Sequence, residues 1–217
     1  MKYYEVDQNY KLSNKKGKGD QFLDWFNDKT NVSMKVMGGI RCRAFRDKYL
    51  PTFGMPSLIV LFETLTNKGS IDNPWKLANF DIISGRLIYP GDAKKNSKGM
   101  KINDFTGNKV FLKCNDAVVE GNEKLIPPII FFQTFAEGWS QFKGLFKFIK
   151  IKNYIEDKTG IKNYEYHLQK INLDKVSVNW LRDRALTRTI SSLDMTAPKE
   201  WKYRDKIIQF DDLKAAN

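Results

Sequence analysis

The chain has 217 residues, enough for one large domain with a substantial core, and 41% of them are apolar, which excludes a disordered protein. No apolar run approaches the ~18 residues of a membrane span, and the first residues lack the apolar region of a signal peptide, so a cytoplasmic protein is expected. The net charge is +12, and residues 86–113 and 143–152 are markedly lysine-rich. Such segregation favours a nucleic-acid partner.

The first half of the chain predicts short elements separated by turns. A mobile basic loop is expected at 11–20 and a short helix at 20–26, with Asp20 as its N-cap. Residues 34–45 predict a strand or turn, and the short apolar run at 57–64 predicts a buried strand. Two strands at 84–90 and 108–114, joined by a Gly-Asp turn and a lysine-rich loop, complete this half.

The second half continues the pattern. A strand entered through Pro127 and Pro128 is expected first, followed by strands at 144–155 and 163–173, where apolar and polar residues alternate. Residues 177–188 predict a helix with Ser177 as N-cap. The many short strands and few helices predict an α+β, mainly β fold, built as a β-barrel or a strongly curved sheet.

The residues give little support for catalysis. The single histidine, His167, excludes histidine-metal nuclease motifs, and Cys42 and Cys114 are expected to be reduced, inert thiols rather than zinc ligands. Asp92 and Lys94, with Asp81 upstream, match the acid-x-Lys pattern of metal-dependent nucleases, but that pattern recurs at chance frequency. No phosphate-binding glycine loop is present. We therefore expect no catalytic residue, metal or cofactor.

Seven segments in order resemble a known family: "GGIR" (38–41), "SGRLIYPGDAK" (84–94), "TGNKVFL" (106–112), "IPPIIFF" (126–132), "GLFKFIKI" (144–151), "KNYEYHLQKINLDKVSVNWLRDR" (162–184) and "APKEW" (197–201). Together they are similar to the DNA-recognition domain of modification-dependent restriction endonucleases of the AspBHI and McrA-like kind. The resemblance implies a bacterial reader with an SRA-like, PUA-like curved barrel at 34–190. A basic segment with a short helix (1–33) would precede it, and a linker or appendage (191–217) would follow.

The resemblance implies that the chain reads a 5-modified cytosine flipped out of duplex DNA. Asp92 would accept a hydrogen bond from the cytosine amino group and Tyr89 would stack on the base, although a turn cap and a core position are the structural alternatives. The other residues expected at the base are Arg41, Arg43, Trp75 and Asn108. Those expected at DNA phosphates are Arg86, Lys94, Lys95, Lys98, Lys101 and Lys109. Trp139 and Trp180 are expected in the core.

Other functions stay open at this point. A metal-dependent nuclease using Asp81, Asp92 and Lys94 is one alternative, and a PUA-like RNA-binding module is another. Ala93 stands where similar domains have asparagine, so the modification is open among 5-methylcytosine, 5-hydroxymethylcytosine, a glucosylated base and a phosphorothioate. The expected partners are modified double-stranded DNA and a nuclease domain or subunit. The oligomeric state is not predicted.

Overall fold

The computed structural model describes residues 2–12, 21–30, 34, 39–48, 50–65, 77–92, 101–155 and 160–204. The strands are β1 (Tyr3–Glu5), β2 (Asn9–Lys11), β3 (Ile40–Arg43), β4 (Leu58–Thr64), β5 (Asn79–Asp81), β6 (Arg86–Pro90), β7 (Ile129–Ala136), β8 (Trp139–Ile155), β9 (Lys162–Lys170) and β10 (Lys175–Ser177). The helices are α1 (Gln21–Thr30), α2 (Thr106–Val119), α3 (Val178–Leu186) and α4 (Lys199–Lys202), with 3-10 turns η1 (Ile102–Asp104), η2 (Glu123–Leu125) and η3 (Ile190–Ser192).

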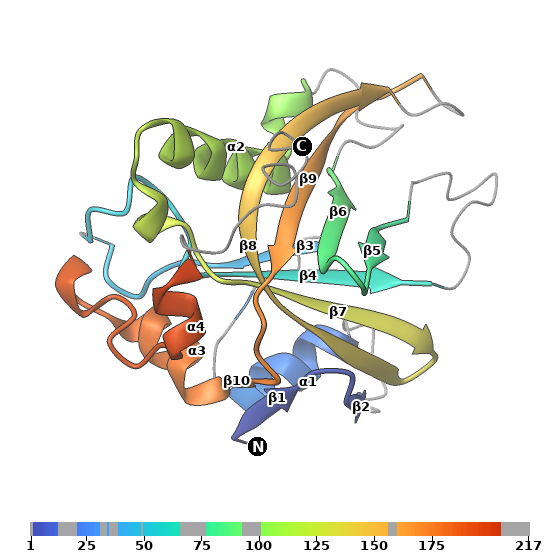
Figure 1. The fold of residues 1–217 in the computed structure, drawn as a ribbon, viewed down its shortest axis with the longest axis horizontal. Helices are drawn as coiled ribbons and strands as arrows, with labels where there is room; N and C mark the ends of the chain where they lie inside the picture. Colours follow the sequence, from blue (N-terminus) through green and yellow to red (C-terminus); the bar gives the residue numbers. More distant parts are fainter. Residues whose placement is uncertain are drawn as a thin grey trace, which may run out of the picture.

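Eight strands form one mixed, strongly curved sheet (Figure 1). Its order is β3-β4-β7-β8-β9-β6-β5, with β2 added on β8, while β1 and β10 form a separate pair. The fold is therefore mainly β, as predicted. Among the described residues the hydrogen-bonded path runs from β3 at one end to β5 at the other, as a strongly curved sheet of the kind the sequence predicted. Among those residues no helix is long and apolar enough to cross a membrane.

Strands β4 and β7 run parallel through the middle of the sheet and are buried on both faces. Val60 and Phe132 face a first core cluster with α1 and α3, whereas Leu61 and Phe131 face a second cluster with α2. A strand covered on both faces needs a nearly continuous apolar run, which explains "LIVLF" and "IIFF". The sequence analysis predicted β4 from its apolar run and β7 as a strand entered through Pro127 and Pro128, and both are confirmed.

The predicted strand at 108–114 is wrong, because these residues belong to helix α2. Within seven residues Val110 and Leu112 look like one face of a strand. The buried positions of the whole segment instead follow helical spacing, namely Gly107, Asn108, Phe111, Cys114 and Ala117. Phe111 stacks on Tyr166 of β9 with ring centroids 3.9 Å apart, which fixes α2 against the sheet.

Both flanking segments contribute to the first core cluster. Tyr4 and Phe26, from the N-terminal segment, are fully buried. So is Trp201 of α4, whose ring centroid lies 5.7 Å from that of Trp180. A single tryptophan carries the packing of α4, so the surrounding sequence shows no periodicity. Trp180 is a core residue as predicted, but Trp139 is 39% exposed and is not.

Candidate nucleic-acid interface

The Gly-Asp turn after β6 meets the first turn of helix α2. The backbone N–H of Gly107 donates a hydrogen bond of 3.0 Å to Oδ2 of Asp92. The backbone N–H of Asp92 in turn donates one of 2.8 Å to Oδ1 of Asn108. A carboxylate at a helix N-terminus is stabilised by the unpaired N–H groups and the helix dipole. Asp92 is therefore held in one orientation by α2.

Asn108 is fully buried and connects the turn to the sheet. Its Oδ1 also accepts a short hydrogen bond from the hydroxyl of Tyr166, and its Nδ2 donates one of 2.8 Å to the carbonyl of Ile102. From the sequence, Asn108 is expected either to read a base edge or to make a turn contact. In the structure, all of these contacts lie within the protein, and they make Asn108 a support for Asp92.

Strand β9 holds the same turn from below. The N–H of Gly91 donates to the carbonyl of Tyr164 at 2.7 Å, and Nδ2 of Asn163 donates to the carbonyl of Gly91 at 3.1 Å. The hydroxyl of Tyr164 reaches Oδ1 of Asn103, near α2, at 2.5 Å. These β9 residues were not predicted as site residues, although the alternating tyrosines of "NYEY" are a signal for them.

Glycine is required at two positions here because backbone and side chains approach closely. A Cβ atom on Gly107 would collide with the Asp92 carboxylate and would lie 2.7 Å from Cδ1 of Ile40. A Cβ atom on Gly91 would lie 2.8 Å from Oδ1 of Asn108. Real Cβ contacts are essentially never this short, so both glycines permit the packing of the turn on α2.

Tyr89 lies in the second core cluster and is only 4% exposed. Its hydroxyl donates a hydrogen bond of 2.9 Å to the carbonyl of Phe62. Burial, and then the negative charge of Glu63, raise the pKa of Tyr89 well above its ordinary value. This is the core position that the sequence offered as the alternative to base stacking.

The side chains of β3 alternate between the two core clusters. Arg41 and Arg43 were expected at the base. Arg41 lies against the first core cluster, with its guanidinium 4.6 Å from the ring centroid of Phe62 and 5.3 Å from that of Phe22. Arg43 shares that face by strand alternation. Cys42 faces the Asp92 side, where burial, and then Asp92, raise the pKa of its thiol to about 12. Cys42 thus lies on the side of β3 that faces the second core cluster, a placement that sequence reasoning missed.

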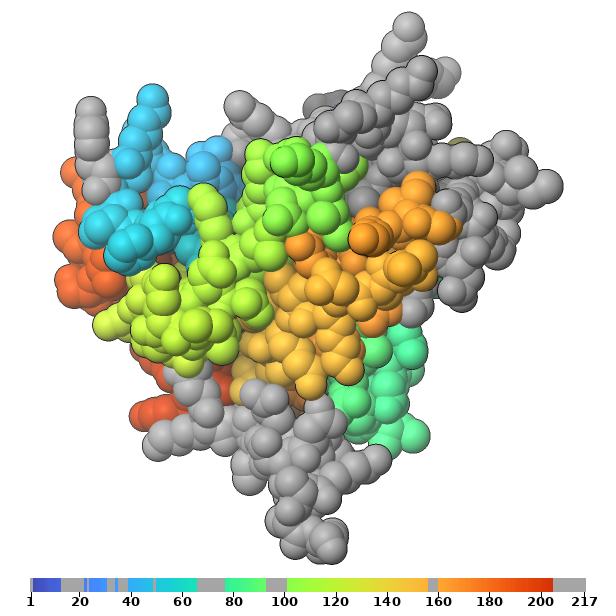
Figure 2. Space-filling model, turned by 90° about the horizontal axis from the view of Figure 1, so that it is seen from above, coloured from blue at the N-terminus to red at the C-terminus, as the bar shows by residue number. Residues whose placement is uncertain are grey.

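The predicted phosphate contacts divide into three groups. Lys101 and Lys109 are exposed, next to η1 and in the first turn of α2. Arg86 is partly buried at the opposite end of β6 from Asp92. Lys94, Lys95, Lys98 and the expected base contact Trp75 lie outside the described residues. Figure 2 shows η1, α2 and the β8–β9 pair forming one continuous surface.

The acids proposed for a metal-dependent nuclease do not meet. Asp81 lies at the start of the turn before β6, and its cross-strand partner is Arg86. Asp92 follows the other end of β6, six residues beyond Arg86, or about 20 Å at the rise of a strand. Two acids that share a metal ion lie within a few ångströms of each other. The geometry therefore contradicts a site built from Asp81 and Asp92.

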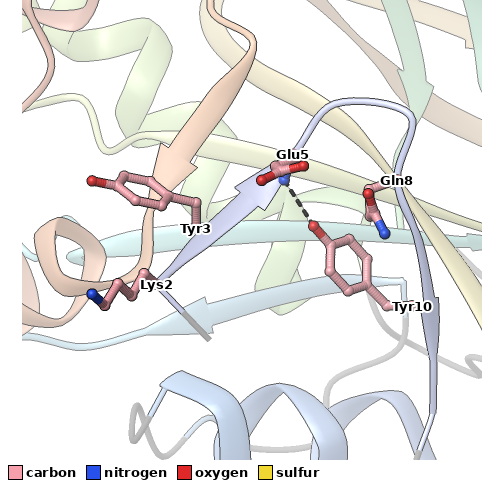
Figure 3. A pocket seen from close by; sticks show the side chains of 5 residues that line it. All are labelled: Lys2, Tyr3, Glu5, Gln8 and Tyr10. Carbon is pink, nitrogen blue, oxygen red and sulfur yellow. Dashed lines mark hydrogen bonds between the residues drawn. The ribbon is translucent and has the colours of Figure 1, made fainter.

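A separate open pocket of about 300 Å³ lies beside β1 and β2 (Figure 3). It is lined by Lys2, Tyr3, Glu5, Gln8 and Tyr10, and the Tyr10 hydroxyl accepts a hydrogen bond from the Glu5 N–H at 2.7 Å. None of the predicted site residues lines it. The turn that carries Asp92 is therefore the better candidate for the site.

The sequence profile of the family described as restriction endonuclease AspBHI N-terminal matches residues 4–212, nearly the whole chain. The chain belongs to this family. The matched residues of the AspBHI N-terminal family include the turn after β6 and helix α2. No curated protein compared with the chain matches it.

Solved structures share the fold. The DNA modification-dependent restriction endonuclease AspBHI aligns with a TM-score of 0.67 and 22% identity, over 92% of this chain and 49% of AspBHI. MspJI restriction endonuclease, in complex with a 27-mer oligonucleotide, aligns with a TM-score of 0.69 and 19% identity, over 93% of this chain and 51% of MspJI. The chain thus spans about half the length of both enzymes. The DNA recognition domain of the cytosine modification-dependent restriction endonuclease LpnPI aligns with a TM-score of 0.62 and 21% identity, over 84% of this chain and 80% of the LpnPI domain.

Proposed function

We propose that the chain binds double-stranded DNA and recognises a flipped 5-modified cytosine, as the specificity domain of a modification-dependent restriction system. Membership of the AspBHI N-terminal family supports this function. So does the fold shared with LpnPI, whose matching part is a DNA recognition domain. The observation that carries the proposal is the Asp92 carboxylate, held by Gly107 and supported through Asn108 on a turn that β9 and α2 both brace.

The chemistry of Asp92 suits the exocyclic amino group of cytosine. That amino group is a hydrogen-bond donor, and acids accept from it. Flipping a nucleotide costs a few kcal/mol, so the accepting group must be held in place before the base arrives. The hydrogen bonds from Gly107 and to Asn108 supply that preorganisation. Lys101 and Lys109 flank the turn and would hold phosphates, a contact that positions DNA without reading sequence.

The restriction endonucleases that share this fold contain a further part that this chain does not match. AspBHI and MspJI are restriction endonucleases about twice as long as the part that aligns. We propose that a nuclease domain or subunit acts together with this reader, in the bacterial cytoplasm where a restriction system meets foreign DNA. Cleavage would then be a property of the assembly.

The test is a competition among duplexes of one sequence that carry cytosine, 5-methylcytosine, 5-hydroxymethylcytosine or glucosylated 5-hydroxymethylcytosine. We expect tighter binding of a modified duplex than of the plain one, measured by fluorescence anisotropy. If about five phosphates are neutralised, log affinity should fall with log salt at a slope of about −4.5. Equal affinity for all duplexes would contradict recognition of a modified cytosine. A slope near zero would remove DNA as the partner.

A further inference from the structure

The turn between β5 and β6 presents two apolar side chains to solvent. Ile82 is 72% exposed and Ile83 is 97% exposed. The turn that carries them is held by its own polar groups: Oδ1 of Asp81 accepts from the Ile83 N–H at 3.0 Å, and Oδ2 accepts from the Ser84 hydroxyl at 2.6 Å. The two isoleucines are therefore displayed on an ordered turn.

The sheet also holds this turn from the side. Nε2 of Gln169 in β9 donates to the carbonyl of Ser84 at 2.8 Å. Gly85 has φ +67°, and a Cβ atom there would lie 3.2 Å from Cβ of Lys170. A turn fixed in this way loses little conformational freedom when it binds. Isoleucines at its tip suit insertion into another molecule.

The turn and Asp92 lie at opposite ends of β6. Arg86, where the turn ends, is about 20 Å from Asp92 at the rise of a strand, and Ile82 and Ile83 lie beyond Arg86. Between the turn and Asp92, the sheet face pointing away from α2 carries cations. Lys150 lies opposite His167, and Lys152 lies opposite Glu165, in the ladder between β8 and β9. Arg86 lies on the same face, because it pairs with Gln169. A basic path therefore connects the two ends of β6.

The size and charge of the tip favour DNA over a protein. Two isoleucines expose far less than the ~800 Å² that each partner buries in a stable protein interface. One or two apolar side chains are enough for a wedge between base steps. The net charge is +12, and at the turn itself the two cations Arg86 and Lys170 outnumber the Asp81 carboxylate, which suits a polyanion.

We propose that Ile82 and Ile83 form an apolar wedge that enters the duplex about six to eight base pairs from the modified cytosine, given ~20 Å from Asp92 to Arg86, the further reach of the turn and the ~3.4 Å rise of DNA. This inference rests on the proposed function, because it assumes a duplex held at Asp92. The wedge unstacks one base step and kinks the duplex toward the sheet. Arg86 and Lys150 then lie along the DNA between the two contacts.

The experiment compares the wild-type chain with Ile82→Ser/Ile83→Ser. The duplexes carry one 5-modified cytosine and a 2-aminopurine at a single position from three to nine base pairs away on either side. We expect a rise in 2-aminopurine fluorescence between the sixth and eighth positions for the wild type, and its loss in the double variant. Affinity should fall about five- to tenfold for modified and plain duplexes alike, with an unchanged salt slope because no charge is removed.

The matched control is Val119→Ser, which removes another apolar side chain, 80% exposed at the end of α2. It should keep the fluorescence signal and the affinity, and melting curves should show all variants folded. A folded double variant that keeps the 2-aminopurine signal and the affinity would overturn the wedge. The exposed isoleucines would then be a contact for a protein partner. Asp92→Ala tests base reading separately. If Asp92→Ala loses discrimination while the isoleucine double variant keeps the 2-aminopurine signal, the wedge is overturned and the proposed function stands. Failure of the wild type to bind any duplex would overturn the proposed function as well.

Discussion

The Asp92 carboxylate accepts a hydrogen bond of 3.0 Å from the backbone N–H of Gly107, so the acid expected to face a base also caps helix α2. Capping by the Gly107 N–H uses one of the roughly four lone-pair sites with which a carboxylate accepts hydrogen bonds. The two roles are therefore compatible. They also separate experimentally, since an amide keeps one accepting oxygen and replaces the other with a donor.

Asp92→Asn should abolish discrimination between modified and plain duplexes while leaving the fold intact. The asparagine oxygen can still accept from Gly107, but its amino group repels the cytosine amino group, at a loss of about 1–3 kcal/mol. Competition binding measures the loss and thermal melting monitors the fold. Asp92→Ala should lose discrimination and, in addition, about 1 kcal/mol of stability through the missing cap. An Asn variant with full discrimination would show that Asp92 is only a helix cap.

Asn108→Ala should destabilise the protein by about 3 kcal/mol or more. It leaves the Asp92 N–H, the Tyr166 hydroxyl and the Ile102 carbonyl without their partner in a buried site. Tyr166→Phe is the matched control, because it removes a single donor and should cost about 1 kcal/mol. Urea denaturation at constant m-value measures both. Equal costs for the two variants would contradict the role of Asn108 as the connecting residue.

His167 should make the protein less stable in mild acid. Its pKa is lowered by burial, and then by the positive charge of Lys152, with Glu165 opposing and Lys150 and Arg86 adding to the shift. The unfolded chain, with an ordinary histidine pKa of about 6.5, therefore takes up a proton before the folded one does. Stability should fall as pH drops below about 6.5, and should level off below the folded pKa.

The measurement compares urea midpoints of the wild type and His167→Gln between pH 8 and pH 5. The difference between the two proteins removes the contribution of the carboxylates, which they share. The wild type should lose stability relative to the variant as the pH falls. Parallel curves across this range would contradict the lowered pKa.

Trp201→Ala should cost about 3–5 kcal/mol, because the side chain is fully buried and packs on Trp180. Its indole N–H also donates to Asp194 at 2.9 Å, and that bond is lost as well. Trp139→Ala is the control, since that side chain is 39% exposed and should cost much less. Urea denaturation curves of both variants measure the loss in the free energy of unfolding. A mild effect at Trp201 would support the linker or appendage that the sequence predicts for residues 191–217.

The sequence by itself determined the elements whose signal is local. The unbroken apolar runs of β4 and β7 reflect burial on both faces, and Ser177 was identifiable as the N-cap of α3, where its hydroxyl accepts from the Trp180 N–H. The Gly91-Asp92 turn was also visible. These features depend on residues adjacent in the chain, so a short window contains the physical cause.

Only the tertiary structure decided what lies around that turn. Gly107 meets Asp92 across fifteen positions, and Asn163 meets Gly91 across seventy-two, contacts that no local pattern encodes. Cys42 packs on the second core cluster and Arg41 lies over the Phe62 ring, because the side of β3 that meets α2 depends on how the sheet packs between its two cores. Residues 106–119 form a helix for the same reason: a strand there would leave Phe111 and Cys114 on opposite faces, whereas a helix buries both against the sheet.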